Sequence, residues 1–123
     1  MSDWARDYYD AVDSMDVEKF AAYHTEDARL RFGNAPRAEG KEQLVEGIKH
    51  FWETIDGMRH DFVEVWEEDD TTIVEADITY QLKNGKEVVL PCVTVLRRDG
   101  DLAKDVRIHM DINPVFAEEV PSA

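Results

Sequence analysis

The last predicted strand, residues 102–112, carries the side chains best suited to proton-transfer chemistry. Its polar residues alternate with apolar ones, so each set lies on its own face of the strand. The polar set is Asp105, Arg107, His109 and Asp111. Histidine titrates near neutrality, and a carboxylate two residues along the strand can orient it or act beside it. Desolvation raises the pKa of an aspartate into a range useful for proton transfer, and a neighbouring arginine opposes that shift.

Alternation alone leaves open which face of this strand is inside. One arrangement buries the apolar set in the core and leaves the polar set as a solvated, ion-paired network. That apolar set is Val106, Ile108, Met110 and Ile112. The other arrangement turns the polar set toward an interior cavity and leaves the apolar set for a subunit interface.

The other histidines and the cysteine form no recognisable site motif. The 4 histidines are scattered, with no His-x-x-x-His or Glu-x-x-His pair, so no metal site is expected. His60 is predicted to be an exposed turn residue, with a position at a pocket rim as the alternative. Cys92 follows Pro91 in a predicted strand with no basic group expected beside it, which favours an inert buried thiol.

Length and composition place these residues in one acidic domain. The 123 residues match a single domain, and 43% hydrophobic and 10% aromatic residues supply a core. The 28 acidic and 14 basic residues give a formal net charge of −14, which disfavours binding to nucleic acid or to anionic membranes. Residues 1–10 contain no apolar signal segment and no run suits a spanning helix, so a cytoplasmic location is expected.

Apolar periodicity predicts helices first and strands afterwards. The i, i+3, i+4 pattern predicts helices over residues 3–15, from Asp16 onward, and over 41–55. Alternation predicts a short strand at 28–32 and then, after the third helix, the strands 62–66, 72–82, 88–98 and 102–112. Helices placed before an antiparallel sheet indicate the α+β class. We expect one domain over 1–123, in which a curved, mostly antiparallel sheet and three N-terminal helices enclose a pocket.

The order of these elements and several short segments are similar to one known superfamily. The segments are Tyr8–Asp13, Asp16–Phe20, Thr25–Ala28, Gly40–Glu42, Leu90–Pro91 and Arg107–Asp111. Together they resemble the nuclear transport factor 2-like superfamily, particularly its SnoaL-like polyketide cyclase and ketosteroid isomerase branch. The resemblance implies a cone-shaped α+β fold with an apolar pocket, and a homodimer paired through the outer face of the sheet. Members include isomerases, cyclases, dehydratases, epoxide hydrolases and binding proteins, so no single activity is implied.

The resemblance also implies roles for the last strand. Alignment with the isomerase pattern through Leu90-Pro91 and the Gly100 turn places the polar set inward. In that arrangement Asp111 and His109 move or orient a proton, and Arg107 binds a polar substituent of the substrate. Cyclases of the superfamily similarly carry an aspartate near the end of the pocket.

The resemblance places Tyr8 at the helix position of the oxyanion-stabilising tyrosine of the isomerases, with a core tyrosine as the alternative. Two other isomerase positions differ in this chain. The proton-shuttling aspartate falls on or near Phe32, and the second oxyanion-hole acid falls on Val93. Steroid-type isomerisation by that mechanism is therefore not expected.

Two further chemistries of the superfamily require residue sets that this sequence contains only in part. Epoxide hydrolases use an Asp-Arg-Asp set, but Asp105, Arg107 and Asp111 lie on one strand, so the comparison fails by position. Dehydratases use histidines with an aspartate and tyrosines, and His24, His60 and His109 keep that alternative open.

The pocket is expected to be apolar and to suit a lipid-like, terpenoid or polycyclic ligand. Its expected wall residues are Phe20, Tyr23, Phe32, Trp52, Ile78, Tyr80, Val93 and Val95. The same side chains would equally fill a solid core. We expect a cofactor-independent enzyme that performs isomerase, cyclase or hydratase chemistry on a small hydrophobic molecule. The alternatives are a non-catalytic protein that binds such a ligand and a dimeric interaction domain.

Overall fold

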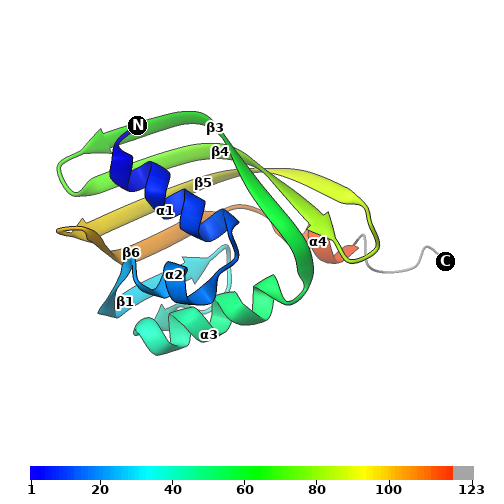
Figure 1. Cartoon of the computed structure of the whole chain (residues 1–123), viewed down its shortest axis with the longest axis horizontal. Coiled ribbons are helices and arrows are strands. Elements are labelled where there is room, and N and C mark those ends of the chain that lie inside the picture. Colours follow the sequence, from blue (N-terminus) through cyan, green and yellow to red (C-terminus); the bar gives the residue numbers. More distant parts are fainter. Residues whose placement is uncertain (118–123) are drawn as a thin grey trace.

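The computed structural model describes residues 1–117, and its centre is one curved sheet partly wrapped around helices (Figure 1). The elements are α1 (Asp3–Asp13), α2 (Val17–Ala21), β1 (His24–Phe32), β2 (Ala38–Glu39), α3 (Lys41–Trp52), β3 (Ile55–Glu68), β4 (Thr71–Leu82), β5 (Glu87–Asp99), β6 (Leu102–His109) and α4 (Asn113–Ala117). The sheet has 6 strands in the order β2-β1-β6-β5-β4-β3. The predicted α+β class with a curved, mostly antiparallel sheet is confirmed. The last residues of the predicted domain, 118–123, lie outside the described residues.

The first two helices begin at side chains that cap them. The Ser2 hydroxyl accepts a hydrogen bond from the Ala5 amide at 3.2 Å. The Asp16 carboxylate accepts hydrogen bonds from the amides of Glu18 and Lys19, at 3.0 and 3.2 Å. Each cap satisfies amides that have no partner within the helix. The caps thereby fix where α1 and α2 begin and which of their residues face the sheet.

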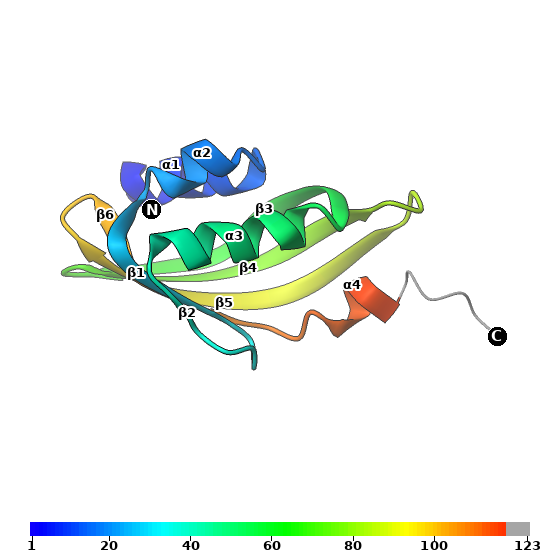
Figure 2. The same ribbon diagram turned by 90° about the horizontal axis from the view of Figure 1, so that it is seen from below.

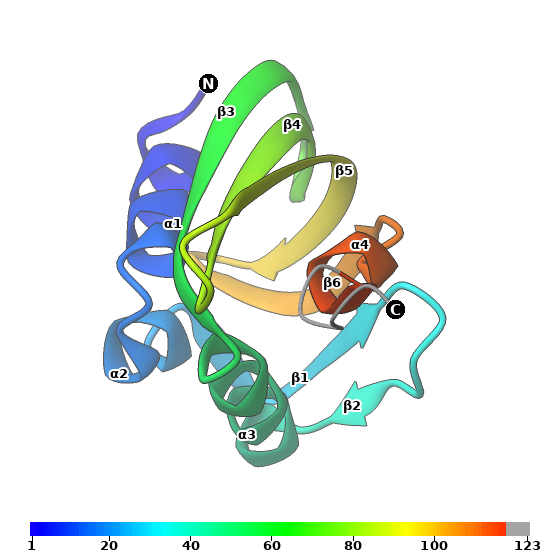
Figure 3. The same ribbon diagram turned by 90° about the vertical axis from the view of Figure 1, so that its right-hand side faces the viewer.

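All neighbouring strands are antiparallel except β1 and β6. Strands β3 to β6 follow one another as the predicted meander, and β1 then pairs in parallel with β6, with Leu30 opposite Val106. This pairing places the first strand beside the last one. Figures 2 and 3 show the result, in which α1, α2 and α3 lie on the concave side of the sheet. In Figure 3, α4 lies at one end of the sheet, near the ends of β6 and β1.

The largest departure from the predicted elements is the start of β3. The sequence predicts a helix to residue 55 and a strand only from 62, but α3 ends at Trp52 and β3 begins at Ile55. Gly57 therefore lies within the strand and not in a helix-ending turn. A Cβ at this position would lie 2.8 Å from the Gln81 side chain on the paired strand, so the glycine permits the close approach.

The two faces of the sheet have different surroundings. We call the concave side, on which Val74, Ile78 and Leu82 of β4 point toward the helices, the inner face. These three side chains are 1–2% exposed and pack in one core with Phe20 and Leu44. The opposite side, toward which the intervening residues point, is the outer face. Among residues 1–117, no helix is both long enough and apolar enough to cross a membrane.

Candidate functional site

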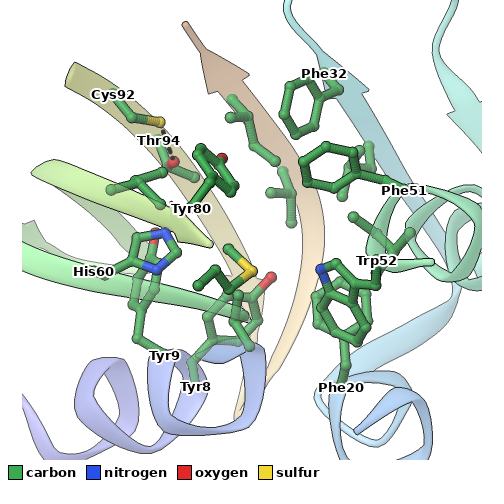
Figure 4. Close-up of a pocket in the computed structure, with 17 residues that line it drawn as sticks. Tyr8, Tyr9, Phe20, Phe32, Phe51, Trp52, His60, Tyr80, Cys92 and Thr94 are labelled. Carbon is green, nitrogen blue, oxygen red and sulfur yellow. Dashed lines mark hydrogen bonds between the residues drawn. The ribbon is translucent and has the colours of Figure 1, made fainter. Parts of the chain in front are cut away.

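The inner face of the sheet and the helices α1, α2 and α3 enclose a narrow, apolar cavity (Figure 4). Its volume is about 40 Å³. The helices contribute Tyr8, Tyr9, Val12, Phe20, Ile48, Phe51 and Trp52 to its walls, and the strands contribute Leu30, Phe32, Met58, His60, Ile78, Tyr80, Cys92, Thr94, Val106 and Ile108. Aromatic and aliphatic side chains together therefore form most of the wall, and few polar groups reach the cavity.

One polar group at the wall belongs to a closed hydrogen-bonded chain. The Tyr8 hydroxyl lies 3.0 Å from Nε2 of His24, and Nδ1 of His24 lies 2.7 Å from the Phe20 carbonyl oxygen. A carbonyl only accepts, so Nδ1 carries the proton, and Nε2 accepts the hydroxyl proton of Tyr8. Burial lowers the pKa of His24 to about 4, although its hydrogen bond to Phe20 opposes the shift. His24 is therefore neutral at neutral pH, which agrees with this tautomer.

These hydrogen bonds limit the role that the Tyr8 hydroxyl can have in catalysis. Tyr8 lines the cavity, where the sequence placed it, but its hydroxyl proton is already donated to His24. Burial, and to a lesser extent the neighbouring Tyr9, raises the pKa of Tyr8 well above its ordinary value. An oxyanion in the cavity would have to displace His24 to receive that proton. The geometry favours the alternative of a core tyrosine with a satisfied hydroxyl.

A second pair, between α1 and β3, leaves one nitrogen free. The Asp13 carboxylate accepts the backbone N–H of His60 at 2.9 Å and its ring Nδ1–H at 2.6 Å. The His60 side chain is 6% exposed and the Asp13 side chain 25% exposed. Because the carboxylate fixes the proton on Nδ1, the lone pair of a neutral ring lies on Nε2. Among the described residues Nε2 has no hydrogen-bond partner, and the ring lines the cavity.

Two tyrosine hydroxyls at the cavity, those of Tyr9 and Tyr80, have a weak hydrogen-bond partner or none among the described residues. The ring of Tyr9 lies 4.7 Å from that of His60, and the buried Tyr9 hydroxyl has no hydrogen-bond partner among the described residues. Burial raises the pKa of Tyr9, and the side chain of Thr94 partly offsets this even though no hydrogen bond of normal geometry joins the two. Among residues 1–117, the Tyr80 hydroxyl donates only to a thioether acceptor, the sulfur of Met110, at 3.6 Å. Both phenols therefore remain protonated and can donate to an oxygen atom in the cavity.

Several predicted wall residues lie at the cavity. Phe20, Phe32, Trp52, Ile78 and Tyr80 all line it, from both helices and strands. Figure 4 shows Phe20 and Trp52 together on one side, with Tyr80 across from them. Their contribution to substrate binding stays a prediction.

Tyr23 does not line the cavity, contrary to the prediction. Its ring makes edge contacts with Tyr8 at 5.9 Å and Trp4 at 6.4 Å, so it supports Tyr8 from the far side. The side chain borders a shallow hollow between α1 and α2 that also contains Lys19 and Asp10.

The predicted inward position of the polar set on the last strand is wrong. Val106 and Ile108 line the cavity, so the residues between them face outward. There Arg107 pairs with Asp105 at 3.3 Å, and Arg29 of β1 pairs with the same carboxylate at 3.2 Å. His109 is exposed on this outer face. Asp105, Arg107 and Arg29 thus form an ion-paired network on the outer face, in which the Asp105 carboxylate is buried, whereas His109 and Asp111 are exposed. The apolar set is the one buried in the core, as in the alternative arrangement.

Asp111 lies beyond the end of β6, outside the cavity. Its side chain is exposed and accepts the amide N–H of Asn113 at 3.0 Å. This bond closes the turn that leads into α4. The structure therefore gives Asp111 a local role in the turn before α4.

The wall residues predicted on β5 are displaced by one position. Val93 and Val95 lie on the outer face, whereas Cys92 and Thr94 point inward and line the cavity. Because side chains alternate along a strand, an error of one residue in aligning Pro91 reverses every assignment on it. The same one-residue error accounts for the inward placement predicted for Arg107 and His109 on the neighbouring strand.

Sequence reasoning missed Asp13 and His60 as a pair. They are 47 residues apart in the chain, and no local motif joins them. One signal was available: extending the predicted strand from Phe62 toward its N-terminus places His60 and Met58 on the same face as Phe62. The structure confirms that His60 and Phe62 share the inner face, since His60 pairs with Ile78 and Phe62 with Ala76, and both partners are buried in the core. Within residues 1–117, no three His, Cys, Asp or Glu side chains are placed to hold a metal ion.

Comparison with known families gives a match over nearly the whole chain. The family model for the SnoaL-like domain matches residues 5–115. The chain belongs to the SnoaL-like domain family. The resemblance inferred from the sequence is thereby confirmed. A search by sequence among curated proteins found no match.

Solved structures with this fold have diverse descriptions. A hypothetical protein with a ketosteroid isomerase-like fold from Catenulispora acidiphila, in complex with trimethylamine, has a TM-score of 0.85 and 14% identity, covering 98% of this chain and 95% of its own. A putative SnoaL-like polyketide cyclase from Jannaschia has a TM-score of 0.83 and 20% identity, covering 97% and 91%. An epoxide hydrolase from M. tuberculosis has a TM-score of 0.77 and 12% identity, covering 93% and 84%. At these identities the similarity establishes the fold alone.

Proposed function

We propose that this SnoaL-like domain is a cofactor-independent acid/base enzyme that removes a proton from the carbon next to a carbonyl group of a small hydrophobic molecule. The observation that supports this is the ring of His60, which lines an apolar cavity while Asp13 holds Nδ1 and Nε2 has no hydrogen-bond partner among the described residues. A base oriented by a buried or half-buried carboxylate is a recurrent arrangement for general base catalysis. Its reaction type belongs to the isomerase, cyclase or hydratase group.

The proposed chemistry can be followed atom by atom. Nε2 of His60 accepts the proton, the electrons of the broken C–H bond form a C–C double bond, and the carbonyl π electrons move to oxygen. Asp13 stabilises the imidazolium that forms, because its carboxylate accepts the Nδ1–H. The unpartnered hydroxyl of Tyr9 donates a hydrogen bond to the enolate oxygen. Return of the proton to another atom gives an isomer, and attack of the enolate carbon on a second carbonyl closes a ring.

The apolar wall supports this reaction in two ways. It excludes water, so a charge that forms on the substrate interacts more strongly with nearby donors. It also selects a hydrophobic substrate, because the walls offer few polar partners. The cavity of about 40 Å³ is small for a ligand site, so wall side chains must move when a substrate enters.

The experiment is proton exchange on a simple ketone. The protein is incubated with 2-hexanone in D₂O, and loss of the α-proton signals is followed by NMR. We expect exchange above the buffer rate, and a loss of about 10²- to 10⁴-fold of that excess in the His60→Gln variant. His50→Gln serves as the matched control, because His50 is exposed on α3, does not line the cavity and pairs with Glu46 at 3.2 Å.

The outcomes separate the proposal from its alternative. Equal exchange by the native protein, by both variants and by buffer would reject the enzymatic role. If 2-hexanone binds in that case, as shown by a concentration-dependent rise in Tm, the domain is a non-catalytic binding protein.

We also propose that the outer face of the sheet pairs with a second copy of the chain. A row of side chains crosses this face from Trp66 through Ile73 and Val95 to Arg107. Trp66 is 46% exposed, and the other apolar members are half-buried. An exposed or half-buried apolar row at the centre of a face, here Trp66, Ile73 and Val95, favours burial in an interface.

Charge on the outer face supports the same pairing. The β3–β4 side carries Glu64, Glu75 and Asp77, whereas the β6–β1 side carries Arg107 and Arg31. A two-fold axis parallel to the strands places the acidic side of one copy over the basic side of the other. The arrangement also brings the central β5 strands of the two copies together.

Light scattering after size-exclusion chromatography tests the dimer. We expect a dimer mass for the native chain and a monomer mass for Val95→Glu, because the new charges face each other near the axis. Leu102→Glu, at the exposed turn between β5 and β6, is the matched control and is expected to stay dimeric. A monomer mass for the native chain at micromolar concentration would contradict the proposal.

A further inference from the structure

A second, larger hollow lies beside the cavity. It is bordered by α3, by β1 and the loop that follows it, and by the segment that leads into α4, and its volume is about 300 Å³. Its walls are Leu30, Phe32, Ala35, Pro36, Ala38, Leu44, Gly47, Ile48, Phe51, Ile112 and Phe116. None of these side chains is polar or ionisable, although 34% of the chain is charged. We call this hollow the side groove.

The side groove and the cavity share one wall. Leu30 and Phe32 of β1 and Ile48 and Phe51 of α3 line both spaces. Figure 4 shows Phe32 and Phe51 at the side of the cavity opposite His60. The partition between the reactive end of the cavity and the groove therefore consists of side chains.

Phe51 is the central element of this partition. Its ring contacts Phe32 at 5.5 Å, Tyr80 at 5.8 Å and Phe116 at 6.4 Å. It is only half-buried, and Phe116 on the groove side is 39% exposed. A phenylalanine ring changes rotamer without any change in the backbone, so its movement can join the two spaces.

A glycine within α3 keeps the groove open. Gly47 lies in the middle of the helix, where glycine is less stable than any other common residue except proline. Among the described residues, no atom outside the adjacent residues and the local helix backbone lies within 4 Å of the position that a Cβ would occupy, and φ is not in the left-handed region. Neither close packing nor backbone conformation requires a glycine here. Its observed effect is to leave space at the groove wall.

We propose that the side groove binds the hydrocarbon tail, straight or isoprenoid, of a substrate whose carbonyl end lies at His60. This inference rests on the proposed function for the position of the carbonyl end. The groove shares the partition with the cavity, every described side chain that lines it is apolar, and it is several times larger than the cavity. A tail that enters it displaces the Phe51 ring and buries methylene groups against α3 and β1.

Binding of a homologous ketone series tests the inference. Dissociation constants are measured for 2-alkanones from 2-hexanone to 2-dodecanone by calorimetry or by tryptophan fluorescence. Each added methylene that enters the groove is expected to lower Kd about three- to fourfold. In Gly47→Leu, whose new side chain fills the groove, we expect the decrease with chain length to stop once the chain reaches the partition.

The matched control adds the same side chain elsewhere on the same helix. Lys49 is exposed on α3 and does not line the groove, so Lys49→Leu is expected to keep the native dependence on chain length. A third variant, Phe51→Ala, removes the partition and is expected to tighten binding of the longer ketones relative to the shortest. Circular dichroism and Tm confirm that each variant is folded.

The readouts separate this inference from the proposed function. If His60→Gln abolishes proton exchange and Gly47→Leu leaves the chain-length series unchanged, the tail site is rejected and the enzymatic role stands. If exchange is absent but the series depends on Gly47, the groove binds hydrocarbon and the enzymatic role is rejected. A change in oligomeric mass on Gly47→Leu, with a flat series in all variants, would show that a second copy covers the groove and would overturn the inference.

Discussion

His24 and His60 are both nearly inaccessible to solvent, but their ring nitrogens have different partners. Both nitrogens of His24 are occupied, one by the Phe20 carbonyl and one by the Tyr8 hydroxyl. In His60, Nδ1 is bound to a carboxylate, Nε2 has no hydrogen-bond partner within residues 1–117, and the ring lines the cavity. Burial alone therefore does not distinguish a structural histidine from a candidate base. The distinction lies in the free lone pair and in a charged partner able to stabilise the protonated ring.

The two pairs also differ in how they respond to protonation. The His24 pair contains no charge, so a proton on this ring is buried without compensation. The His60 pair contains a carboxylate, so a proton on that ring forms an ion pair. The same residue type thus serves folding in one pair and suits proton transfer in the other.

Removing the charge from Asp13 is expected to have the largest effect. Asp13→Asn keeps an oxygen that can accept from Nδ1 of His60 but no longer stabilises the imidazolium. We expect proton exchange on 2-hexanone to fall about 10²-fold or more, with the ketone Kd nearly unchanged. NMR exchange and calorimetry measure the two quantities. Equal loss of binding and exchange would mean that Asp13 acts only by holding the fold.

His24→Gln is expected to affect stability and its pH dependence. A folded pKa of about 4 against 6.5 in the unfolded chain means that the unfolded state takes up the proton first as pH falls. The native protein therefore loses stability progressively between pH 6.5 and 4, by about 3 kcal/mol from this group. Urea unfolding at pH 7, 5.5 and 4 measures this loss of unfolding free energy.

The variant isolates this contribution from those of the carboxylates. His24→Gln removes the titrating ring, so the stability difference between the native protein and the variant is expected to shrink as pH falls from 7 to 4. A difference that stays constant with pH would show that His24 does not titrate below its ordinary range. Proton exchange per folded molecule is expected to persist in this variant, because His60 is retained.

Tyr8→Phe removes the hydroxyl that is bonded to His24, and its expected effects on stability and on proton exchange are smaller. Loss of the donor leaves Nε2 of His24 without a partner, which is expected to cost about 1–2 kcal/mol of stability. Exchange is expected to fall by less than about tenfold, because the Tyr8 proton is not directed at the substrate. A loss as large as that in Asp13→Asn would restore the oxyanion role that the sequence suggested.

The smallest effects are expected on the outer face and in the turn before α4. His109→Gln and Asp111→Asn alter exposed side chains outside the cavity, so exchange on 2-hexanone is expected to remain at the native rate. Asp111→Asn keeps an oxygen that can accept the Asn113 amide, so its stability is also expected to be near native. Lost exchange in either variant would contradict the assignment of the inner face.

Much of the fold was predictable because it depends on local patterns. The apolar stripes predicted α1 within two residues of its observed ends and α2 within one residue of its observed start, and alternation predicted β4 and β5 nearly in full. The aromatic cavity wall was also predictable in part, since Tyr8, Phe20 and Trp52 belong to helical stripes that must face the sheet.

The candidate base could not be predicted in the same way. The pair forms only because β3 begins at Ile55, which puts His60 on the inner face, and because the end of α1 lies against that strand. Neither condition is local to Asp13 or to His60. The helix predicted to residue 55 displaced the start of the strand and left His60 in a turn.

The sequence by itself determined which residues of a strand share a face, because side chains alternate with a period of two whatever the strand's surroundings. The order of the elements and several short segments also gave a resemblance to the SnoaL-like family, which the match of the family model over residues 5–115 confirms. Only the tertiary structure decided which face is inside. On β6, the cover of α1–α3 buries Val106 and Ile108 and turns Arg107 and His109 outward. The physical reason is that burying the apolar set removes hydrocarbon from water, whereas on the outer face His109 keeps its hydration and the Asp105 carboxylate is compensated by ion pairs with Arg29 and Arg107.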